Sequence, residues 1–265
     1  YKRQCLGCEL DDIVVFGADT DISPYDSGSY ASSTAYLTGT AVVKTCEALK
    51  EKILHKAAKY LETGAEELEF DGKRVYKLAC EADGTRKEIT IKDLANRVQC
   101  ANEDALQVTQ SHSSPISPPP FMAGAAEVEV DLETGQVELI KFAAAVDCGT
   151  PLNENLARVQ TEGGLVQGIG MALYEDVSYS KDGKVHENSF MQYKVPSRLD
   201  VGRVQVEFES SFEPTGPFGA KSIGEVVINT PSPAIANAVY NAVGVRIREL
   251  PITAEKVFKG MNGLD

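Results

Sequence analysis

A polar, proline-rich stretch between residues 102 and 121 divides this sequence into two parts of unequal length. The stretch ends in the run Ser117-Pro118-Pro119-Pro120. Proline lacks the backbone N–H that a helix interior or a central strand needs, and serine and proline clusters are typical of loops and linkers. We therefore predict a first subdomain over 1–110, a linker over 111–122 and a second subdomain over 123–265.

The first part combines a strong helix signal with a long polar loop. From Thr34 to about Leu61 the apolar residues recur at helical spacing, which predicts a helix. The segment 18–33 is dense in Asp, Ser, Gly, Pro and Tyr, and so long a loop is unusual unless it binds something. Around these features we predict a strand at 13–16, a hairpin turn at Asp71-Gly72, a strand at 89–91 and a helix at 92–98.

The second part alternates strands and helices. Glycines inside its first predicted helix, at 157–174, each cost about 1 kcal/mol relative to alanine, which indicates that another segment packs very close to this helix. Strands and helices interleave without an internal repeat, so the predicted fold class is α+β (mixed α/β), with mixed sheets, packed helices and two subdomains. The other predicted elements are strands at 125–131, 136–146 and 204–212, and helices at 232–243 and 253–258 with Ser232 and Thr253 as their caps.

Composition excludes several classes of partner. Lys and Arg total 26 against 39 Asp and Glu, a formal net charge of −13. A nucleic-acid binder needs a basic face for phosphate, and docking on anionic lipid needs one too, so we expect neither partner. No apolar run approaches the roughly 18 residues of a membrane helix, and no secretory signal pattern is visible, so we expect a cytoplasmic protein. Because the chain begins at Tyr1 without a Met, we interpret it as a fragment or one piece of a larger polypeptide.

The cysteines do not form a disulfide framework. Cys5 and Cys8 have the CxxC spacing of some zinc sites and redox motifs, but the other cysteines are scattered singly and supply no second pair. Free thiols are the favoured interpretation, and metal or redox chemistry at this pair is the alternative.

Three segments could carry chemistry. The run Gly219-Ala220-Lys221-Ser222-Ile223-Gly224-Glu225 presents one carboxylate in a glycine-containing loop; a carboxylate held away from solvent can act as a general base, and a solvated loop residue is the alternative. Gln160 and Gln167 lie two helical turns apart, so both amides face one side, either as ligand contacts or as an ordinary polar stripe. Small residues before Thr34 expose backbone N–H groups at a helix start, which suits an anion or a simple cap from Ser32 or Ser33.

Together these segments resemble the molybdenum hydroxylases, the xanthine dehydrogenase/aldehyde oxidase family, in the C-terminal half of their molybdenum-cofactor-binding subunit. The first segment is similar to the family pattern GDTD…PY…GSxAS, here running from Gly17 to Ser32. The second is similar to DCG…QxEGGxxQGxG, here Asp147-Cys148-Gly149 and then 160–170. The third is similar to GAKxxGE, here 219–225. The sequence departs from the family at Ser33, where Arg is frequent, and at Val226, where Pro is common.

The resemblance implies a molybdopterin-binding-domain-like fold and a definite chemistry. The family hydroxylates an electron-poor carbon of a purine or related N-heterocycle, or of an aldehyde, with water as the oxygen source. Glu225 matches the active-site glutamate, the general base, and Gly224, which precedes it in the motif, is expected to bind the cofactor. Gln160 matches the glutamine that contacts the pterin, with Gln167 as a second candidate. The molybdenum is held by the pterin dithiolene, so no protein metal ligand is expected. The residues that match the small-residue loop beside the cofactor are Ser29, Tyr30, Ala31 and Ser32.

The resemblance also implies what lies elsewhere. The cofactor is molybdenum-molybdopterin, alone or as its cytosine dinucleotide, and an upstream molybdopterin-binding half completes its site. Iron-sulfur clusters and FAD are expected in partner domains or subunits, because this sequence has no cysteine spacing for a [2Fe–2S] domain and no flavin-binding pattern. We therefore expect the isolated chain to be inactive and to retain cofactor poorly. The alternatives are a catalytically silent cofactor-binding or assembly domain on the same scaffold, and an acidic interaction module in which the glycines serve packing.

Overall fold

The computed structural model of the chain describes residues 1–17, 19–26 and 28–264. It divides into two compact units: the first comprises residues up to 29 together with 34–116, and the second comprises 30–33 and the residues from 117 onward. The segment 30–33, the end of the predicted cofactor loop, thus groups with the second unit. Ala18 and Ser27, which belong to the predicted loop, lie outside the described residues.

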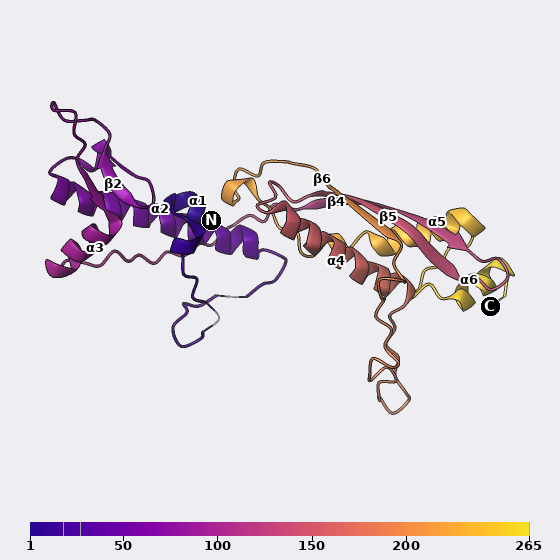
Figure 1. Cartoon of the computed structure of the whole chain (residues 1–265). Helices are drawn as coiled ribbons and strands as arrows, with labels where there is room; N and C mark the ends of the chain where they lie inside the picture. Colours follow the sequence, from indigo (N-terminus) through magenta and orange to yellow (C-terminus); the bar gives the residue numbers. More distant parts are fainter. Residues whose placement is uncertain (18, 27, 265) are drawn as a thin grey trace. The chain divides into compact units, whose positions relative to one another are not determined.

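The first unit is built on one long helix, α2, which covers a small antiparallel sheet. The helix spans Thr34–Leu61, the bounds that the apolar spacing predicts. Its buried face, with Ile53 and Ala57, packs with Val75 of the sheet and Leu94 of the following helix. The elements of this unit, drawn from indigo to magenta in Figure 1, are α1 (Lys2–Leu6), η1 (Leu10–Asp12), α2, η2 (Ala65–Glu67), β1 (Leu68–Phe70), β2 (Arg74–Lys77), β3 (Glu88–Thr90) and α3 (Ile91–Cys100), with the sheet in the order β1-β2-β3.

The predicted strand at 13–16 is wrong. The segment is irregular, and the side chain of Val14 is 86% exposed and that of Phe16 68%. A strand is stabilised by hydrogen bonds to a neighbour, and an apolar run indicates a strand only if a sheet edge is available to it.

Electrostatic contacts hold the segment after α3 to the long helix. The Glu103 carboxylate accepts hydrogen bonds from Lys56 Nζ at 2.7 Å, Lys59 Nζ at 2.5 Å and Tyr60 Oη at 3.0 Å. The two lysine hydrogen bonds lower the pKa of Glu103 to about 2.

We expect this depressed pKa to make the contribution of Glu103 to stability depend on pH. A carboxylate whose pKa is lower in the folded than in the unfolded state stabilises the fold above its unfolded pKa, about 4.3, and loses that contribution as the pH falls toward 2. Urea unfolding of the wild type and Glu103→Gln, between pH 7 and pH 3, should therefore show a gap in midpoint that is constant above about pH 5 and narrows below it. A gap that is unchanged at pH 3 would contradict this prediction.

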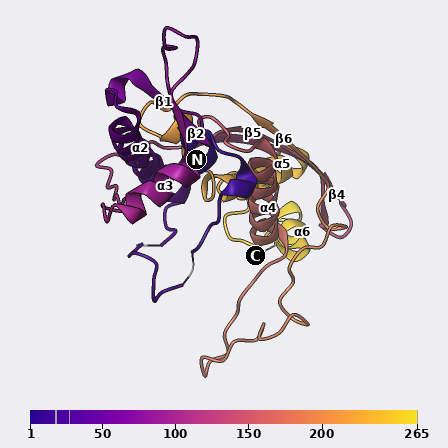
Figure 2. The same cartoon turned by 60° about the vertical axis from the view of Figure 1, so that its left-hand side comes forward.

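The second unit is a mixed sheet with two helices on one face. β4 (Phe121–Val130) pairs antiparallel with β5 (Val137–Asp147), and β5 pairs parallel with β6 (Arg203–Phe208). The core joins Phe142 of β5 to α4 (Glu154–Leu173) through Leu165 and Ile169, and to α5 (Pro231–Val243) through Ile235. Figures 1 and 2 show both helices along this sheet, with the α4–β6 connection extending away from it. The remaining elements are η3 (Pro217–Gly219), η4 (Val226–Ile228) and α6 (Ala254–Met261).

The α+β class with mixed sheets and packed helices is confirmed, and several bounds differ from the predicted ones: β4 begins at Phe121 rather than at 125, and α4 begins at Glu154 rather than at 157. β6 ends at Phe208 rather than at 212, although the Glu209 N–H still donates a hydrogen bond of 2.9 Å to the Val146 carbonyl of β5. The N-cap of α5 is Thr230 rather than Ser232, since Pro231 already occupies the first helical position. At α6 the prediction is confirmed, because the Thr253 side chain accepts a hydrogen bond from the Lys256 N–H. In the described parts of the chain, no helix has the length and apolar character needed to cross a membrane.

Candidate functional site

Three segments that are distant in sequence meet in the second unit. Ser32 Oγ donates a hydrogen bond of 2.9 Å to Glu225 Oε2. Gly224 lies between two of the predicted contacts, since a Cβ built on it would be 2.9 Å from Ser32 Oγ and 3.8 Å from Gln160 Nε2. The structure therefore brings together a hydroxyl, an amide and a carboxylate, one from each of the three motifs. We call Ser32, Gln160, Gly224 and Glu225 the candidate site.

The backbone at Ala31 and Ser32 is left-handed, with φ of 47° and 56°. This conformation costs a residue with a Cβ about 1–3 kcal/mol, and it persists only where the surroundings fix it. Hydrogen bonds from the Ser33 backbone N–H (3.1 Å) and Oγ (2.9 Å) to the Tyr30 carbonyl close the turn. Both strained positions carry small side chains, of which Ala31 is exposed and Ser32 partly buried. Tyr30 is exposed, and Ser29, which belongs to the first unit, hydrogen-bonds to the hydroxyl of Thr34.

One end of the Glu225 loop is fixed to the end of β5. The Lys221 N–H donates to the Cys148 carbonyl at 2.8 Å, and the Thr150 N–H donates to the Gly219 carbonyl at 2.7 Å. A Cβ at Gly149, whose φ is 71°, would lie 2.3 Å from the Gly219 carbonyl oxygen, so this approach requires a glycine.

The other end of the loop packs against α4. Val227, fully buried in η4, contacts the helix where a Cβ on Gly164 would be only 2.1 Å from Val227 Cγ2. One turn later, a Cβ on Gly168 would be 3.0 Å from the carbonyl oxygen of Ile228 and 2.7 Å from Pro231 Cγ. The prediction that a segment packs closely against this glycine-rich helix is confirmed, and that segment is the one that follows Glu225.

The two glutamines both lie on α4, but only Gln160 is near the candidate site. Both side chains are exposed, as expected for one outward face of the helix. The atoms nearest to a Cβ at Gly224 include Gln160 Nε2 and none of Gln167. The structure thus places Gln160 in the candidate site and Gln167 two turns further along the same helix.

Of the two interpretations of Glu225, a carboxylate held away from solvent and a solvated loop residue, the structure of this chain shows the second. Glu225 is exposed, because it stands at the residue before η4, on the outward side of a turn whose buried side is taken by Val227. Its carboxylate is oriented by the Ser32 hydroxyl rather than by an apolar enclosure.

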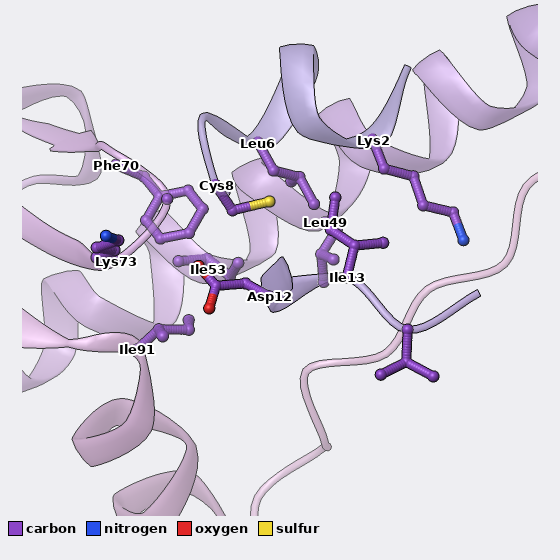
Figure 3. Close-up of a pocket in the computed structure, with 12 residues that line it drawn as sticks. Lys2, Leu6, Cys8, Asp12, Ile13, Leu49, Ile53, Phe70, Lys73 and Ile91 are labelled. Carbon is purple, nitrogen blue, oxygen red and sulfur yellow. The ribbon is translucent and has the colours of Figure 1, made fainter. Parts of the chain in front are cut away.

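A separate cavity lies within the first unit (Figure 3). Its volume is about 620 Å³, and its walls are mostly apolar, with Leu49 and Ile53 of α2 and Phe70 of β1 among them. Lys2 and Asp12 bring charge to it, but none of the motif residues lines it. The cavity is therefore not the candidate site.

Comparison with known proteins identifies the family. The model of the molybdopterin cofactor-binding domain matches residues 3–202. The Escherichia coli K12 protein named "Probable hypoxanthine oxidase XdhD" is 33% identical over 97% of this chain and 27% of its own length. The Escherichia coli O157:H7 xanthine dehydrogenase molybdenum-binding subunit is 30% identical over 97% of this chain and 34% of its own. The chain thus spans about a quarter to a third of these relatives.

Comparison with solved structures supports the same family. The Cu,Mo-CO dehydrogenase crystal structure superposes with a TM-score of 0.86 at 27% identity, over 99% of this chain and 33% of that one. Quinoline 2-oxidoreductase from Pseudomonas putida 86 gives 0.81 at 25% identity, over 100% of this chain and 34% of that one. Matches to both the family model and these folds confirm the resemblance that the three motifs carry. The chain belongs to the molybdopterin cofactor-binding domains of the xanthine dehydrogenase/aldehyde oxidase family, the molybdenum hydroxylases.

Proposed function

We propose that this chain is the part of a molybdenum hydroxylase that holds the pterin cofactor and supplies the general base, Glu225. The observation that carries the proposal is the convergence of Ser32, Gln160 and Glu225 around Gly224. A carboxylate at a fixed position, with an amide and a small-residue backbone beside it, provides the base and the ligand contacts that the family chemistry requires.

The residues present fit a pterin. At Gly224 the absence of a side chain leaves the space between the Ser32 hydroxyl and the Gln160 amide, which a Cβ would fill. Amide, hydroxyl and backbone N–H groups are neutral donors and acceptors, suited to a ligand rich in heteroatoms. Gln160 and the backbone of Tyr30, Ala31 and Ser32 would contact the cofactor, with Gln167 as a further contact; the contribution of Ser29 stays a prediction. When bound, the cofactor supplies the redox and oxygen-transfer chemistry, its molybdenum being held by the pterin dithiolene.

Glu225 would accept a proton from the oxygen nucleophile that attacks the substrate carbon. The Ser32 hydroxyl donates to one carboxylate oxygen, Oε2, which leaves Oε1 for the proton. The hydrogen bond also stabilises the ionised form of a carboxylate, the form in which it serves as a base. This role needs the ligand to displace water from the exposed face of Glu225.

We propose a purine or a related N-heterocycle as the substrate. The relatives named hypoxanthine oxidase and xanthine dehydrogenase, together with a Paenarthrobacter nicotinovorans protein named nicotine 6-hydroxylase large subunit, all carry names of N-heterocycle chemistry. An aldehyde, the other substrate class that the resemblance implies, is the competing outcome of a substrate test; a relative named carbon monoxide dehydrogenase large chain carries a name without an N-heterocycle.

We also propose that the electrons from the reaction leave through partner domains or subunits that carry iron-sulfur clusters and FAD. We propose that the complex acts in the cytoplasm. Several relatives are named as a subunit or a large chain, one of them as a subunit of a dehydrogenase complex. An upstream molybdopterin-binding half would complete the pterin site, and the cofactor would be molybdopterin itself or its cytosine dinucleotide.

The exposure of Glu225 favours one alternative, a catalytically silent cofactor-binding or assembly domain. In that case cofactor would be present, but the carboxylate would not meet a substrate. The alternative predicts normal molybdenum content and no dependence of any turnover on Glu225.

The test is cofactor and turnover analysis of the protein purified with its natural partners. We expect about one molybdenum per chain by mass spectrometry of the metal, a pterin detected by fluorescence after oxidation, and turnover of hypoxanthine or another N-heterocycle that places ¹⁸O from labelled water in the product. A preparation that contains no pterin would refute the proposal, and would support an acidic interaction module instead.

A further inference from the structure

Lys221 is a charged residue whose side chain is buried. It lies in the loop that carries Glu225, and its side chain is 7% exposed. Its Nζ is 2.6 Å from Asp147 Oδ2 at the end of β5, and 5.2 Å from the centroid of the Phe121 ring at the start of β4. A lysine so placed loses most of its hydration, and only its partners compensate for that loss.

Both carboxylate oxygens of Asp147 accept hydrogen bonds. Oδ2 accepts from Lys221, and Oδ1 accepts from Ser211 Oγ at 2.5 Å and from the Gly149 N–H at 2.9 Å. Burial raises the pKa of Asp147, but the hydrogen bonds from Lys221 and Ser211 outweigh burial and hold its pKa below the ordinary value. Asp147 is therefore ionised at neutral pH, and its hydrogen bonds join three segments: the β5 end, the segment after β6, and the Glu225 loop.

Lys221 lies three residues before Gly224 and four before Glu225 in the chain. Between Lys221 and Val227, both of which are buried, the loop runs through partly or fully exposed residues. The loop is thus held at its two buried ends, by the Asp147 carboxylate and by the α4 surface at Gly164, and the carboxylate of Glu225 projects between them.

We propose that Lys221 is a positioning residue: its ion pair with Asp147, supported by Ser211, sets the place at which the Glu225 carboxylate meets the Ser32 hydroxyl. This inference rests on the proposed function of Glu225. An apolar pair of similar volume at 147 and 221 would stabilise a fold as well as a buried ion pair does, so stability alone does not account for the charges. A directional bond with fixed partners instead determines one geometry of the loop, and misplacement of a catalytic group by about 1 Å can cost on the order of 100-fold in rate.

The experiment compares three variants in the protein purified with its natural partners. Lys221→Met removes the ion pair; Lys221→Arg keeps the charge; and Lys221→Met combined with Asp147→Leu removes both charges without leaving an unpaired buried carboxylate. The matched control is Lys259→Met, which removes a lysine from an exposed ion pair with Glu255 on α6. Each variant is compared by kcat per bound molybdenum, by KM, by thermal midpoint, and by hydrogen–deuterium exchange of the backbone at 222–228, which is read on protein without cofactor as well.

We expect Lys221→Met and the double variant to lower kcat per bound molybdenum by about tenfold or more, with KM nearly unchanged, and to speed exchange at 222–228 in both preparations. Lys221→Arg should restore part of the rate, and Lys259→Met should change neither rate nor exchange. A double variant with normal kcat and normal exchange at 222–228 would overturn the proposal, whatever its thermal midpoint. The exchange readout separates the two proposals: if Glu225 proves unimportant for turnover while exchange at 222–228 still rises, the proposed function fails and the anchoring of the loop stands.

Discussion

Replacing Glu225 by Gln is expected to lower kcat per bound molybdenum by about 10²–10⁴-fold, the range that a positioned general base contributes. Gln has the size of Glu, and its side-chain oxygen can still accept the hydrogen bond from Ser32, so loop geometry is preserved. The amide has no basic oxygen of comparable proton affinity, so the proton of the nucleophile has no acceptor. KM and molybdenum content should change little, because the base acts in the transition state rather than in binding.

Two further variants make this result specific to Glu225. Glu207→Gln removes an exposed carboxylate on β6 and should leave kcat within about twofold of the wild type, as surface substitutions usually do. Glu225→Asp keeps a carboxylate but withdraws it by one methylene, and should fall between wild type and Glu225→Gln. Turnover of Glu225→Gln within twofold of the wild type, with cofactor retained, would favour the silent cofactor-binding domain.

Replacing Gly149 by Ala is expected to destabilise the second unit by about 3 kcal/mol or more. The left-handed φ of 71° costs a residue with a Cβ roughly 1 kcal/mol or more, and the Cβ would also lie 2.3 Å from the Gly219 carbonyl oxygen and 2.8 Å from the Lys221 nitrogen. These are backbone atoms, so the 219–221 segment must move away from β5. Thermal unfolding should show a midpoint lowered by roughly 6 °C or more, at about 2–4 °C per kcal/mol for a protein of this size.

Gly183→Ala is the matched control for this prediction. Gly183 has a similar φ of 77°, but nothing lies within 4 Å of its Cβ position. It therefore carries the conformational cost alone, about 1 kcal/mol. The difference between the two variants measures the close approach of β5 and the Glu225 loop, and equal losses of stability would show that this approach is not needed.

Patterns of neighbouring residues predicted the elements that are stabilised by contacts between neighbouring residues. The bounds of α2 follow from apolar spacing, and the cap at Thr253 follows from its hydroxyl and position. The glycines at 164 and 168 indicated a close neighbour correctly, because a helix tolerates that many glycines only where something requires them. The apolar run at 13–16 looks like a strand locally. The strand prediction was wrong because a strand must pair with a sheet edge, and that edge is supplied by another part of the fold.

The candidate site was predicted through its resemblance to a family rather than through spacing. Nothing local in the sequence places Ser32 beside Glu225, because the two residues lie 193 positions apart in the chain. The burial of Lys221 was missed for the same reason, whereas an exposed Glu225 was one of the two alternatives that the sequence left open. A lysine in a polar loop is ordinarily solvated, and its signal appears only when Asp147, in the DCG motif, is seen as its partner.

The parallel pairing of β5 with β6 has a kinetic consequence. β4 and β5 are joined by a tight turn, so they can pair early in folding. β6 can pair with β5 only after the chain between Asp147 and Arg203, which includes α4, has crossed back over the sheet. The loop that bears Glu225 follows β6 in the chain and docks onto the end of β5, so it is ordered among the last parts of this unit. A folding intermediate with an intact β4–β5 hairpin would then lack an ordered Glu225 loop, and the proposed pterin site would form only when this loop closes.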